Sequence, residues 1–334
     1  MRKLLEELCC LDGVSGNESP VANYIIEQIK DCCEYYIDTL GNIIAFKKGN
    51  ARPENKIMLD AHMDEVGLIV TDICDNGLLK FTTVGGIDIS VLLAKRVRFS
   101  KVKGVITFKP IHLTSAESRN EYPEKDTLFI DIGAKDRAEA EALVKLGDTA
   151  CFDTEFIQNG DNILAKAIDN RTGCAQLIKL LKEESAYDFY AVFSVQEEVG
   201  LRGARTAAYT IEPDYAIVLE STTAADIAGV PEEKQVCSLG KGVTLSFMDS
   251  GTLYDRGLYE TALAPAHRCS IAVQTKKGTS GGNNSGAIHL TKGGVKTVTL
   301  STPCRYIHSP ASVADYKDIE ASKNLAKALI SVLA

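Results

Sequence analysis

The stretch Lys56-Ile-Met-Leu-Asp60-Ala-His62-Met-Asp64-Glu65 joins a short apolar run to a cluster of charged side chains. The run from Lys56 to Leu59 has the length of a strand in a protein core. A histidine and three carboxylates follow it within residues 60–65. Because functional groups in open α/β sheets gather beyond the carboxyl ends of strands, this segment predicts an α/β fold with a site at one edge of the sheet.

After residue 161 the sequence alternates between strand and helix patterns. Strands are predicted at 189–195, 215–219, 243–247, 271–273 and 295–300, and helices at 170–184, 201–209, 253–267 and 314–333. Before residue 50, two helices are followed by a hairpin around Leu40-Gly41-Asn42. The alternation is typical of a mostly parallel sheet with helices on both faces.

Residues 71–161 have a different texture from the rest of the chain. Short β-branched runs alternate there with glycines such as Gly85-Gly86, Gly104 and Gly133, and one good helix is predicted, from Asp136 to Leu146. The full length of 334 residues suggests about two domains. We therefore expect a small β-rich domain inserted into a larger α/β domain.

The charge balance excludes some classes of partner. The chain has 37 basic and 45 acidic residues, and its formal net charge is −8. This balance argues against nucleic acid or an anionic membrane as the main partner, since both attract positive charge. No apolar run approaches the ~20 residues of a membrane-spanning helix. Glu6 and Glu7 interrupt what would be the apolar core of a secretory signal, so we expect a cytoplasmic protein.

Ten cysteines are present, and none is arranged as Cys-x-x-Cys. A cytoplasmic chain of this length does not need disulfide bonds for its stability. We therefore expect reduced thiols that act as small core residues, with a redox or metal role for one of them as the alternative. Cys304 lies near His308 in the sequence, but no neighbouring base has an evident claim on it as a nucleophile.

Five predicted strand or strand-like ends deliver a carboxylate or an imidazole. Such a mixture suits a divalent ion such as Zn²⁺, Co²⁺ or Mn²⁺, and two neighbouring ions need one bridging carboxylate with about two further ligands each. The residues that fit this count are His62, Asp169, Glu198, Glu220 and His308. Either histidine alone also fits a buried structural role, so the prediction of a metal site depends on the joint pattern.

Two local pairs add detail to this prediction. In an extended segment residues i and i+2 point to one side, so Asp64 can accept a hydrogen bond from the second ring nitrogen of His62 and fix its tautomer. In the pair Glu197-Glu198, one carboxylate can bind metal while the other stays free as a general base. Either pair alone is common, and the functional interpretation again depends on the whole set.

These residues lie in strings that resemble the M42 family of metallo-aminopeptidases, which includes the glutamyl, deblocking and tetrahedral aminopeptidases. The resemblance runs from about residue 3 to the C-terminus, with the strings in the family's order and spacing. The matching strings are Asp60-Ala-His-Met-Asp-Glu-Val-Gly67, Val84-Gly-Gly-Ile-Asp88, Lys109-Pro-Ile-His-Leu113, Ile130-Asp-Ile-Gly-Ala134, Ala167-Ile-Asp-Asn-Arg-Thr-Gly173, Gln196-Glu-Glu-Val-Gly-Leu-Arg-Gly203 and Arg305-Tyr-Ile-His-Ser309.

The resemblance implies an α/β fold with a zinc-peptidase-like mixed sheet flanked by helices, and with an inserted small β-barrel. Residues 1–68 and 160–334 are expected to form a discontinuous catalytic domain. Residues 69–159 are expected to form a β-rich dimerisation or lid domain. Since members of the family form dimers or tetrahedral dodecamers, the resemblance also implies self-association. The family metals are usually zinc or cobalt, so two such divalent ions are the expected cofactors.

The resemblance also assigns roles to the residues singled out above. Two ligand pairs and a bridge are implied, namely His62 with Glu220, Glu198 with His308, and Asp169 between the ions. Asp64 would orient His62. Glu197 would be the general base that activates a water between the ions, and that water would attack the first peptide bond of a peptide substrate.

Two alternatives to an aminopeptidase remain open at this point. Paired carboxylates also fit a glycosidase of the endoglucanase type, and the same fold could serve as a catalytically silent assembly or binding protein. The chain departs from the family at two positions. Asn284 stands where many relatives carry a carboxylate, which affects local contacts but none of the ligands, and Glu220 stands where aspartate is common. The preferred N-terminal residue is not predicted.

Overall fold

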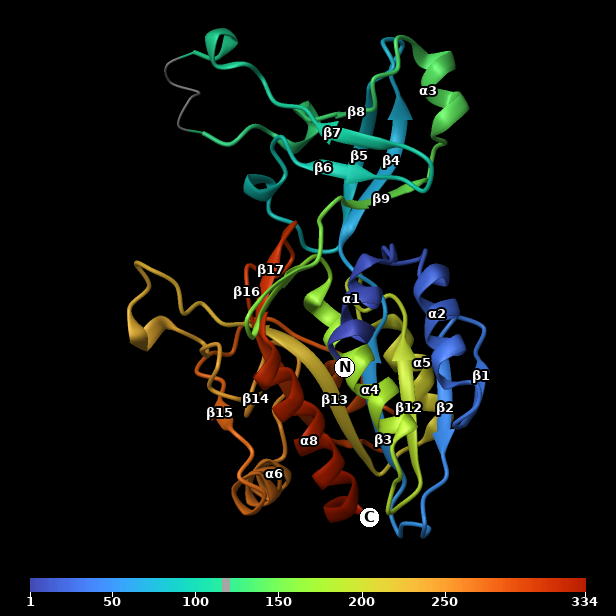
Figure 1. Cartoon of the computed structure of the whole chain (residues 1–334), viewed down its shortest axis with the longest axis vertical. Coiled ribbons are helices and arrows are strands. Elements are labelled where there is room, and N and C mark those ends of the chain that lie inside the picture. Colours follow the sequence, from blue (N-terminus) through green and yellow to red (C-terminus); the bar gives the residue numbers. More distant parts are fainter. Residues whose placement is uncertain (116–120) are drawn as a thin grey trace.

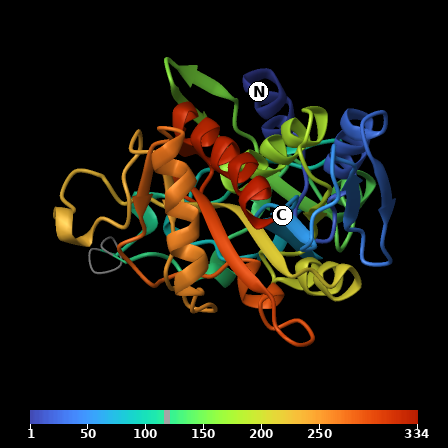
Figure 2. The same cartoon turned by 90° about the horizontal axis from the view of Figure 1, so that it is seen from below.

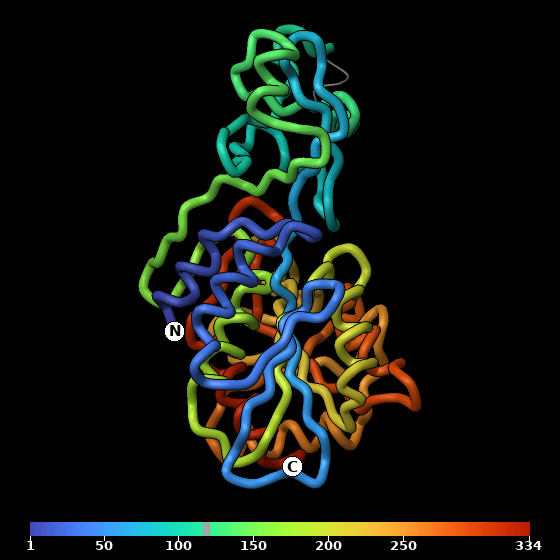
Figure 3. The backbone as a smooth tube through the Cα atoms, turned by 90° about the vertical axis from the view of Figure 1, so that its right-hand side faces the viewer, coloured from blue at the N-terminus to red at the C-terminus, as the bar shows by residue number. Residues whose placement is uncertain are grey.

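The architecture is that of a large α/β body with a small β-barrel at one end (Figure 1). It is seen in a computed structural model that describes residues 1–115 and 121–334. The barrel strands fall between two stretches of sequence that belong to the large sheet, so the barrel is an insertion (Figure 3). This arrangement confirms the predicted fold class.

In the part of the chain that the structure describes, the large sheet has eleven strands and is mixed. Its main path runs through β1 (Glu34–Ile37), β2 (Ile43–Lys47), β12 (Phe189–Ser194), β3 (Ile57–His62), β13 (Tyr215–Thr223), β16 (Lys296–Arg305), β17 (Ser312–Asp315), β11 (Asn162–Ala165) and β10 (Ile157–Asn159). β14 (Val243–Leu245) pairs with β16, and β15 (Val273–Thr275) pairs with β14. In the described structure β12, β3, β13 and β16 form one run of parallel neighbours and β14 pairs with β15 in parallel, while the other pairs of the sheet are antiparallel, so the sequence pattern overstated how parallel the sheet is.

Helices cover both faces of this sheet. One face is packed by α1 (Arg2–Cys10), α2 (Ser19–Ile29), α4 (Ile168–Lys182), α6 (Arg256–Arg268) and α8 (Tyr316–Leu333), and the other by α5 (Arg202–Ile211) and α7 (Ser285–Ile288). Because side chains alternate along a strand, Ile57 and Leu59 of β3 pack under α4 while Met58 packs on the α5 side. From below, α6 and α8 lie side by side (Figure 2).

Among the described residues, six antiparallel strands close the barrel. In spatial order they are β4 (Gly67–Ile73), β5 (Leu79–Val84), β8 (Ile130–Asp131), β7 (Lys103–Ile106), β6 (Arg96–Arg98) and β9 (Thr149–Phe152). Short helices accompany the barrel, namely η1 (Ile89–Val91), η2 (Ile111–Leu113), η4 (Lys125–Thr127) and α3 (Arg137–Leu143), while η5 (Glu232–Lys234) belongs to the large body. The barrel has a hydrophobic core of its own, so it can pack independently of the sheet.

Two predicted elements differ from the structure in ways that matter for the site. The strand predicted to end at 219 continues to Thr223, because β13 pairs with β16 over nine consecutive residues. Glu220 therefore lies inside a strand and does not follow one. The helix predicted from residue 314 begins at Tyr316, because Ser312–Asp315 form β17 and Asp315 caps α8 through the backbone amide of Lys317. β10, inside the predicted insert, pairs within the large sheet.

The structure also bears on two sequence expectations, one about membrane-spanning helices and one about the cysteines. Among the described residues, no helix has both the length and the apolarity needed to cross a membrane. All ten cysteines are free thiols, and five of them are buried. Burial raises the pKa of Cys9 to about 12, and it also raises the pKa of Cys304. A thiolate is thus disfavoured at Cys304, which agrees with a packing role.

Candidate active site

The carboxyl end of β3 places His62 at the centre of the site. His62 is the last residue of the strand and is buried. Its Nδ1 lies 3.1 Å from the backbone oxygen and 3.3 Å from the carboxylate of Asp64. The ring is thereby held with its other nitrogen, Nε2, directed at Asp169 and Glu220. The structure thus shows the close His62–Asp64 contact that the i, i+2 spacing predicted.

Asp169 connects two clusters of side chains. Its Oδ1 lies 3.2 Å from Nε2 of His62, and its Oδ2 lies 3.3 Å from Nε2 of His308. Glu220 completes the first cluster at 3.3 Å from His62, and Glu198 completes the second at 3.3 Å from His308. Asp169 stands at the start of α4, but its backbone angles are non-helical. In this conformation its carboxylate reaches both histidines.

The geometry of both clusters fits a divalent metal ion. Ligand atoms at about 2.0 Å from a tetrahedral ion are about 3.3 Å from one another, and the four distances given above are 3.2–3.3 Å. Oε1 of Glu198 and Oε2 of Glu220 are buried without a hydrogen-bond partner in the described structure. Such unpaired buried oxygens are costly unless a cation compensates them. Nitrogen and oxygen donors of this kind suit Zn²⁺ or Co²⁺.

The burial and mutual repulsion of the carboxylates also indicate a binding site for a cation. Burial and the charge of Asp169 raise the pKa of Glu198 to about 8 and that of Glu220 to about 8. Burial lowers the pKa of His308, but Asp169 and Glu198 outweigh this effect and raise it to about 9. Crowded carboxylates that resist ionisation attract a positive charge, which a divalent ion supplies.

Glu197 stands beside the two clusters on the loop after β12. Asp64 holds this loop, because its carboxylate accepts hydrogen bonds from the backbone amides of Glu197 at 3.0 Å and Glu198 at 3.1 Å. The same carboxylate accepts a bond of 2.6 Å from the hydroxyl of Ser15. Asp64 therefore positions both His62 and the Glu197-Glu198 pair, whereas the sequence predicted only the first of these contacts.

A cavity of about 480 Å³ opens onto the clusters. His62, Asp169, Glu198, Glu220 and His308 all line it, together with Glu197. Burial raises the pKa of Glu197 well above its usual value, and the charges of Glu220 and Glu198 add to this effect. A carboxylate with a raised pKa beside such clusters is suited to accept and return a proton.

A network of buried charges lies behind the site, and the sequence analysis missed it. Glu65, Lys166 and Arg171 are almost completely buried. Glu65 accepts hydrogen bonds from Lys166 at 2.7 Å and from Arg171 at 3.0 Å. These residues flank Asp64 and Asp169 in the sequence, so the network anchors the segments that carry them. Glu65 and Arg171 stood in the quoted strings, but nothing there indicated that they pair.

Asn284, the departure noted in the sequence, lies beneath the site and does not line the cavity. It is fully buried, and its amide donates to Asp60 at 2.7 Å and to Ser194 at 2.9 Å. No hydrogen bond joins it to any of the five predicted ligands in the described structure. Its effect on the site therefore passes through the packing of β3 and β12.

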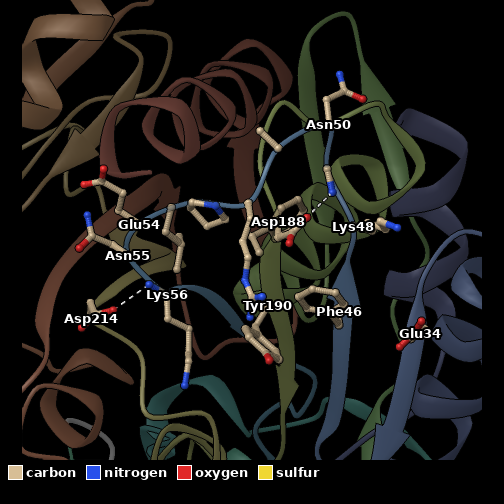
Figure 4. A pocket seen from close by; sticks show the side chains of 16 residues that line it. Glu34, Phe46, Lys48, Asn50, Glu54, Asn55, Lys56, Asp188, Tyr190 and Asp214 are labelled. Atoms are coloured by element: carbon tan, nitrogen blue, oxygen red, sulfur yellow. Dashed lines mark hydrogen bonds between the residues drawn. The ribbon is translucent and has the colours of Figure 1, made fainter.

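A second, larger cavity of about 770 Å³ lies at the opposite end of the central strands (Figure 4). Its carboxylates hold the connecting segments, since Asp188 accepts from the backbone amide of Gly49 at 2.7 Å and Asp214 from that of Lys56 at 2.7 Å. None of the predicted site residues lines it. Size alone thus does not single out the candidate site, which lies toward the carboxyl ends of the parallel strands, where ligands bind in open α/β sheets.

The fold and the site define an α/β protein with a candidate centre for two metal ions, and comparison with known proteins identifies the family. The sequence profile described as "M42 glutamyl aminopeptidase" matches residues 41–325. A putative aminopeptidase of Acetivibrio thermocellus is 40% identical over 100% of this chain and 98% of its own length. The lysyl aminopeptidase of Pyrococcus furiosus is 34% identical over 100% and 96%. This chain therefore belongs to the M42 peptidase family.

Solved structures agree with this membership. An aminopeptidase from Desulfurococcus kamchatkensis superposes with a TM-score of 0.93 at 36% identity, covering 98% of this chain and 93% of that one. The TET1 peptidase of Pyrococcus horikoshii, described as assembling into a tetrahedron or a large octahedral shell, gives 0.87 at 33% identity and 98% coverage of both chains. A Thermotoga maritima protein described as an endoglucanase gives 0.82 at 35%, covering 98% and 96%.

Proposed function

We propose that the protein is a two-metal aminopeptidase that removes N-terminal residues from peptides. The observation that carries this proposal is the pair of clusters that share Asp169, with one oxygen facing each histidine. Membership of the M42 family and relatives named as aminopeptidases support peptides as the substrates. The proposal thus combines a chemical argument from the site with the activity of the family.

Each cluster would hold one divalent ion, zinc or cobalt. The ligands proposed for the first ion are His62, Asp169 and Glu220, and those for the second are Asp169, Glu198 and His308. When bound, two such ions polarise the carbonyl of the first peptide bond and lower the pKa of a water molecule. Asp64 keeps the Nε2 nitrogen of His62 free for its ion by contacting Nδ1.

Glu197 is proposed as the general base and acid. Its carboxylate lines the cavity, and burial raises its pKa above that of an ordinary glutamate, which makes it a stronger base. It takes the proton from the attacking water and then delivers this proton to the nitrogen of the departing peptide. The backbone bond from the amide of Glu197 to Asp64 fixes the loop, so the carboxylate stays beside the clusters through both transfers.

Replacing Glu197 by glutamine tests this assignment. Glu197→Gln is expected to bind two equivalents of Zn²⁺ as the parent does, because Glu197 is not a proposed ligand. Its turnover of an aminoacyl p-nitroanilide is expected to fall by about 10²- to 10⁴-fold, the usual contribution of general acid–base catalysis. Glu232→Gln, an exposed site on the same body, is the control. Near-parental turnover by Glu197→Gln would refute its role.

A glycosidase is the second candidate, because one structural relative is described as an endoglucanase. Retaining and inverting glycosidases use two carboxylates and do not usually need a metal ion. Chelation followed by assays on an aminoacyl p-nitroanilide and on a β-glucan separates the two proposals. We expect hydrolysis of the p-nitroanilide alone, lost on chelation and restored by Zn²⁺ or Co²⁺. Metal-independent cleavage of the glucan would favour the glycosidase.

We also propose that the chain assembles into a dimer or a tetrahedral dodecamer, with the barrel domain contributing to the contacts. Structural relatives described as dodecamers or as tetrahedral and octahedral shells support self-association. A chain of 36.1 kDa predicts about 72 kDa for a dimer and about 433 kDa for a dodecamer. Light scattering measures the mass directly, and a monomer at micromolar concentration would contradict the proposal.

A further inference from the structure

A buried asparagine ties together the two ends of the loop that carries the proposed base. This loop, residues 195–203, joins β12 to α5, and at its neck the backbone amide of Gly203 donates to the backbone oxygen of Val195 at 3.0 Å. Asn42 lies across this neck. Its side-chain oxygen accepts from the backbone amide of Val195 at 3.0 Å, and its side-chain amide donates to the backbone oxygen of Gly203 at 3.0 Å.

The pairing of β2 with β12 explains why Asn42 reaches the neck (Figure 1). The two strands are antiparallel, and Ile43 of β2 lies opposite Phe193 of β12. Asn42 therefore stands just before β2, at the point where β12 ends. It is fully buried, and Asp38 accepts a hydrogen bond of 2.6 Å from its side-chain amide. The sheet and Asp38 thus fix Asn42 independently of the loop that it holds.

Gly203 shows how closely the neck is packed. A Cβ atom at this position would lie 2.3 Å from the side-chain oxygen of Asn42 and 2.4 Å from the backbone oxygen of Val195. Both distances are too short for a non-bonded contact. Gly203 is not among the glycines with positive φ, so the neck requires glycine for close approach and not for an unusual backbone angle.

The backbone of the loop is strained, so its shape depends on such contacts. Gln196 and Leu201 have φ of +56° and +57°, a left-handed conformation that is unfavourable for residues other than glycine. Strained angles persist only where the surrounding structure holds them. Asp64 holds the middle of the loop through two backbone amides, as described above, and Asn42 holds its ends. Without Asn42 the ends are free to separate, and the strained angles can relax.

We propose that Asn42 is a positioning residue that keeps Glu197 and Glu198 in place beside the two clusters. This inference rests on the two-metal function proposed above. The loop supplies a ligand, Glu198, to the second cluster only, because the ligands of the first lie on β3, α4 and β13. Loss of Asn42 is therefore expected to weaken the second ion and the action of the base, while the first ion keeps its affinity.

The asymmetry between the two ions tests the proposal in Asn42→Ala. Calorimetric titration with Zn²⁺ measures both affinities, and Glu198→Gln and Glu220→Gln assign the two binding steps to the two clusters. In Asn42→Ala, the step that Glu198→Gln weakens is expected to weaken by about 10-fold, and the other by less than about threefold. At saturating zinc, kcat for an aminoacyl p-nitroanilide is expected to fall by about 10-fold, with KM within about threefold.

Asn55→Ala is the control. The side-chain amide of Asn55 donates to the backbone oxygen of Leu333 at 3.0 Å, so this variant also loses a bond between side chain and backbone, but at the opposite end of the sheet. It is expected to keep both zinc affinities and kcat. Equal weakening of both ions in Asn42→Ala would overturn the proposal, since a general loss of structure would explain it. Parental values of kcat and of both affinities would overturn it as well.

Gly203→Ala disturbs the same neck and leaves Asn42 unchanged. Its Cβ atom forces the neck apart, so the same one-sided loss of zinc affinity is expected. This variant decides the question if Asn42→Ala is not recovered as a folded protein. Unchanged binding of the second ion by a folded Gly203→Ala protein would contradict the proposal.

Hydrogen exchange separates this outcome from the proposed function. A parent that binds no Zn²⁺ and hydrolyses no aminoacyl p-nitroanilide refutes the two-metal aminopeptidase, but the neck is still measurable. Exchange of the backbone amides of residues 195–203 is expected to quicken by about 10-fold in Asn42→Ala and to stay parental in Asn55→Ala, because one bond at the neck closes each end of the loop. A parental exchange rate in Asn42→Ala would overturn the role of Asn42.

Discussion

Removing one charge from the buried network behind the site is predicted to cause an unusually large loss of stability. In Lys166→Met a side chain of similar length remains, but the ammonium group is removed. Lys166 is 1% exposed, and it donates to both oxygens of Glu65, at 2.7 and 2.8 Å, and to the backbone oxygen of Leu11 at 2.6 Å. The substitution therefore removes three short, charge-assisted hydrogen bonds at once, of which the two to Glu65 are buried.

The expected cost follows from what remains around Glu65. Arg171 and the backbone amide of Gly13 both donate to Oε1, so Oε2 loses its only donor in the described structure. Breaking a buried ion pair by removing one partner costs about 3–5 kcal/mol, mainly because the other charge stays buried. Since a protein is stable by about 5–15 kcal/mol in total, the midpoint of thermal unfolding is expected to fall by on the order of 10 °C.

Thermal and urea unfolding, followed by circular dichroism, measure this cost. The zinc concentration is kept fixed, because bound metal itself raises stability. Lys317→Met is the control, since Lys317 is 75% exposed and its pair with Asp161 at 2.7 Å is a surface one. Its removal is expected to cost less than about 1 kcal/mol. A Lys166→Met protein within 1 kcal/mol of its parent would refute the reasoning about the network.

Two further predictions concern the site itself. Asp64→Asn is expected to lower zinc affinity and kcat/KM by about 10- to 100-fold, because one of the two carboxylate oxygens that accept the backbone bonds from Glu197 and Glu198 becomes an amide nitrogen, which cannot accept. Ser15→Ala removes only the 2.6 Å bond to the same carboxylate and is expected to have a smaller effect; equal effects would contradict this view. Zinc binding at pH 7 is expected to release protons, since the pKa of His308 is raised to about 9 and that of Glu198 to about 8 in the metal-free chain. The affinity should therefore rise with pH up to about 9, and calorimetry in two buffers of different ionisation enthalpy measures the proton release; its absence would show that these ligands are already deprotonated.

Much of the fold was predictable because it depends on local patterns. Strand and helix periodicity identified the parallel centre of the sheet, and the glycine-rich change of texture identified the inserted β-rich region. The edges were less predictable, since antiparallel pairs such as β17 with β11 depend on contacts far apart in sequence. Glu220 illustrates the consequence: its strand continues past the predicted end because β16 pairs alongside it.

The residue types of the site were also predictable, because histidines and carboxylates at strand ends are unusual and chemically specific. Even the contact between His62 and Asp64 was predictable from their spacing, since side chains at i and i+2 of an extended segment point to one side. The bridging geometry of Asp169 was not accessible in this way. It requires that a residue at the start of α4 meet two histidines separated by 246 positions in the numbering of the chain, from His62 to His308.

By itself, then, the sequence determined which donor atoms the candidate site offers, because these are a property of the residues. The tertiary structure decided which groups pair with each other, because hydrogen bonds and ion pairs form or fail with differences in distance of a few tenths of an ångström. Lys276 and Lys277 show the difference most simply. They are identical and adjacent in the sequence, yet packing buries the first in the cavity wall and leaves the second exposed.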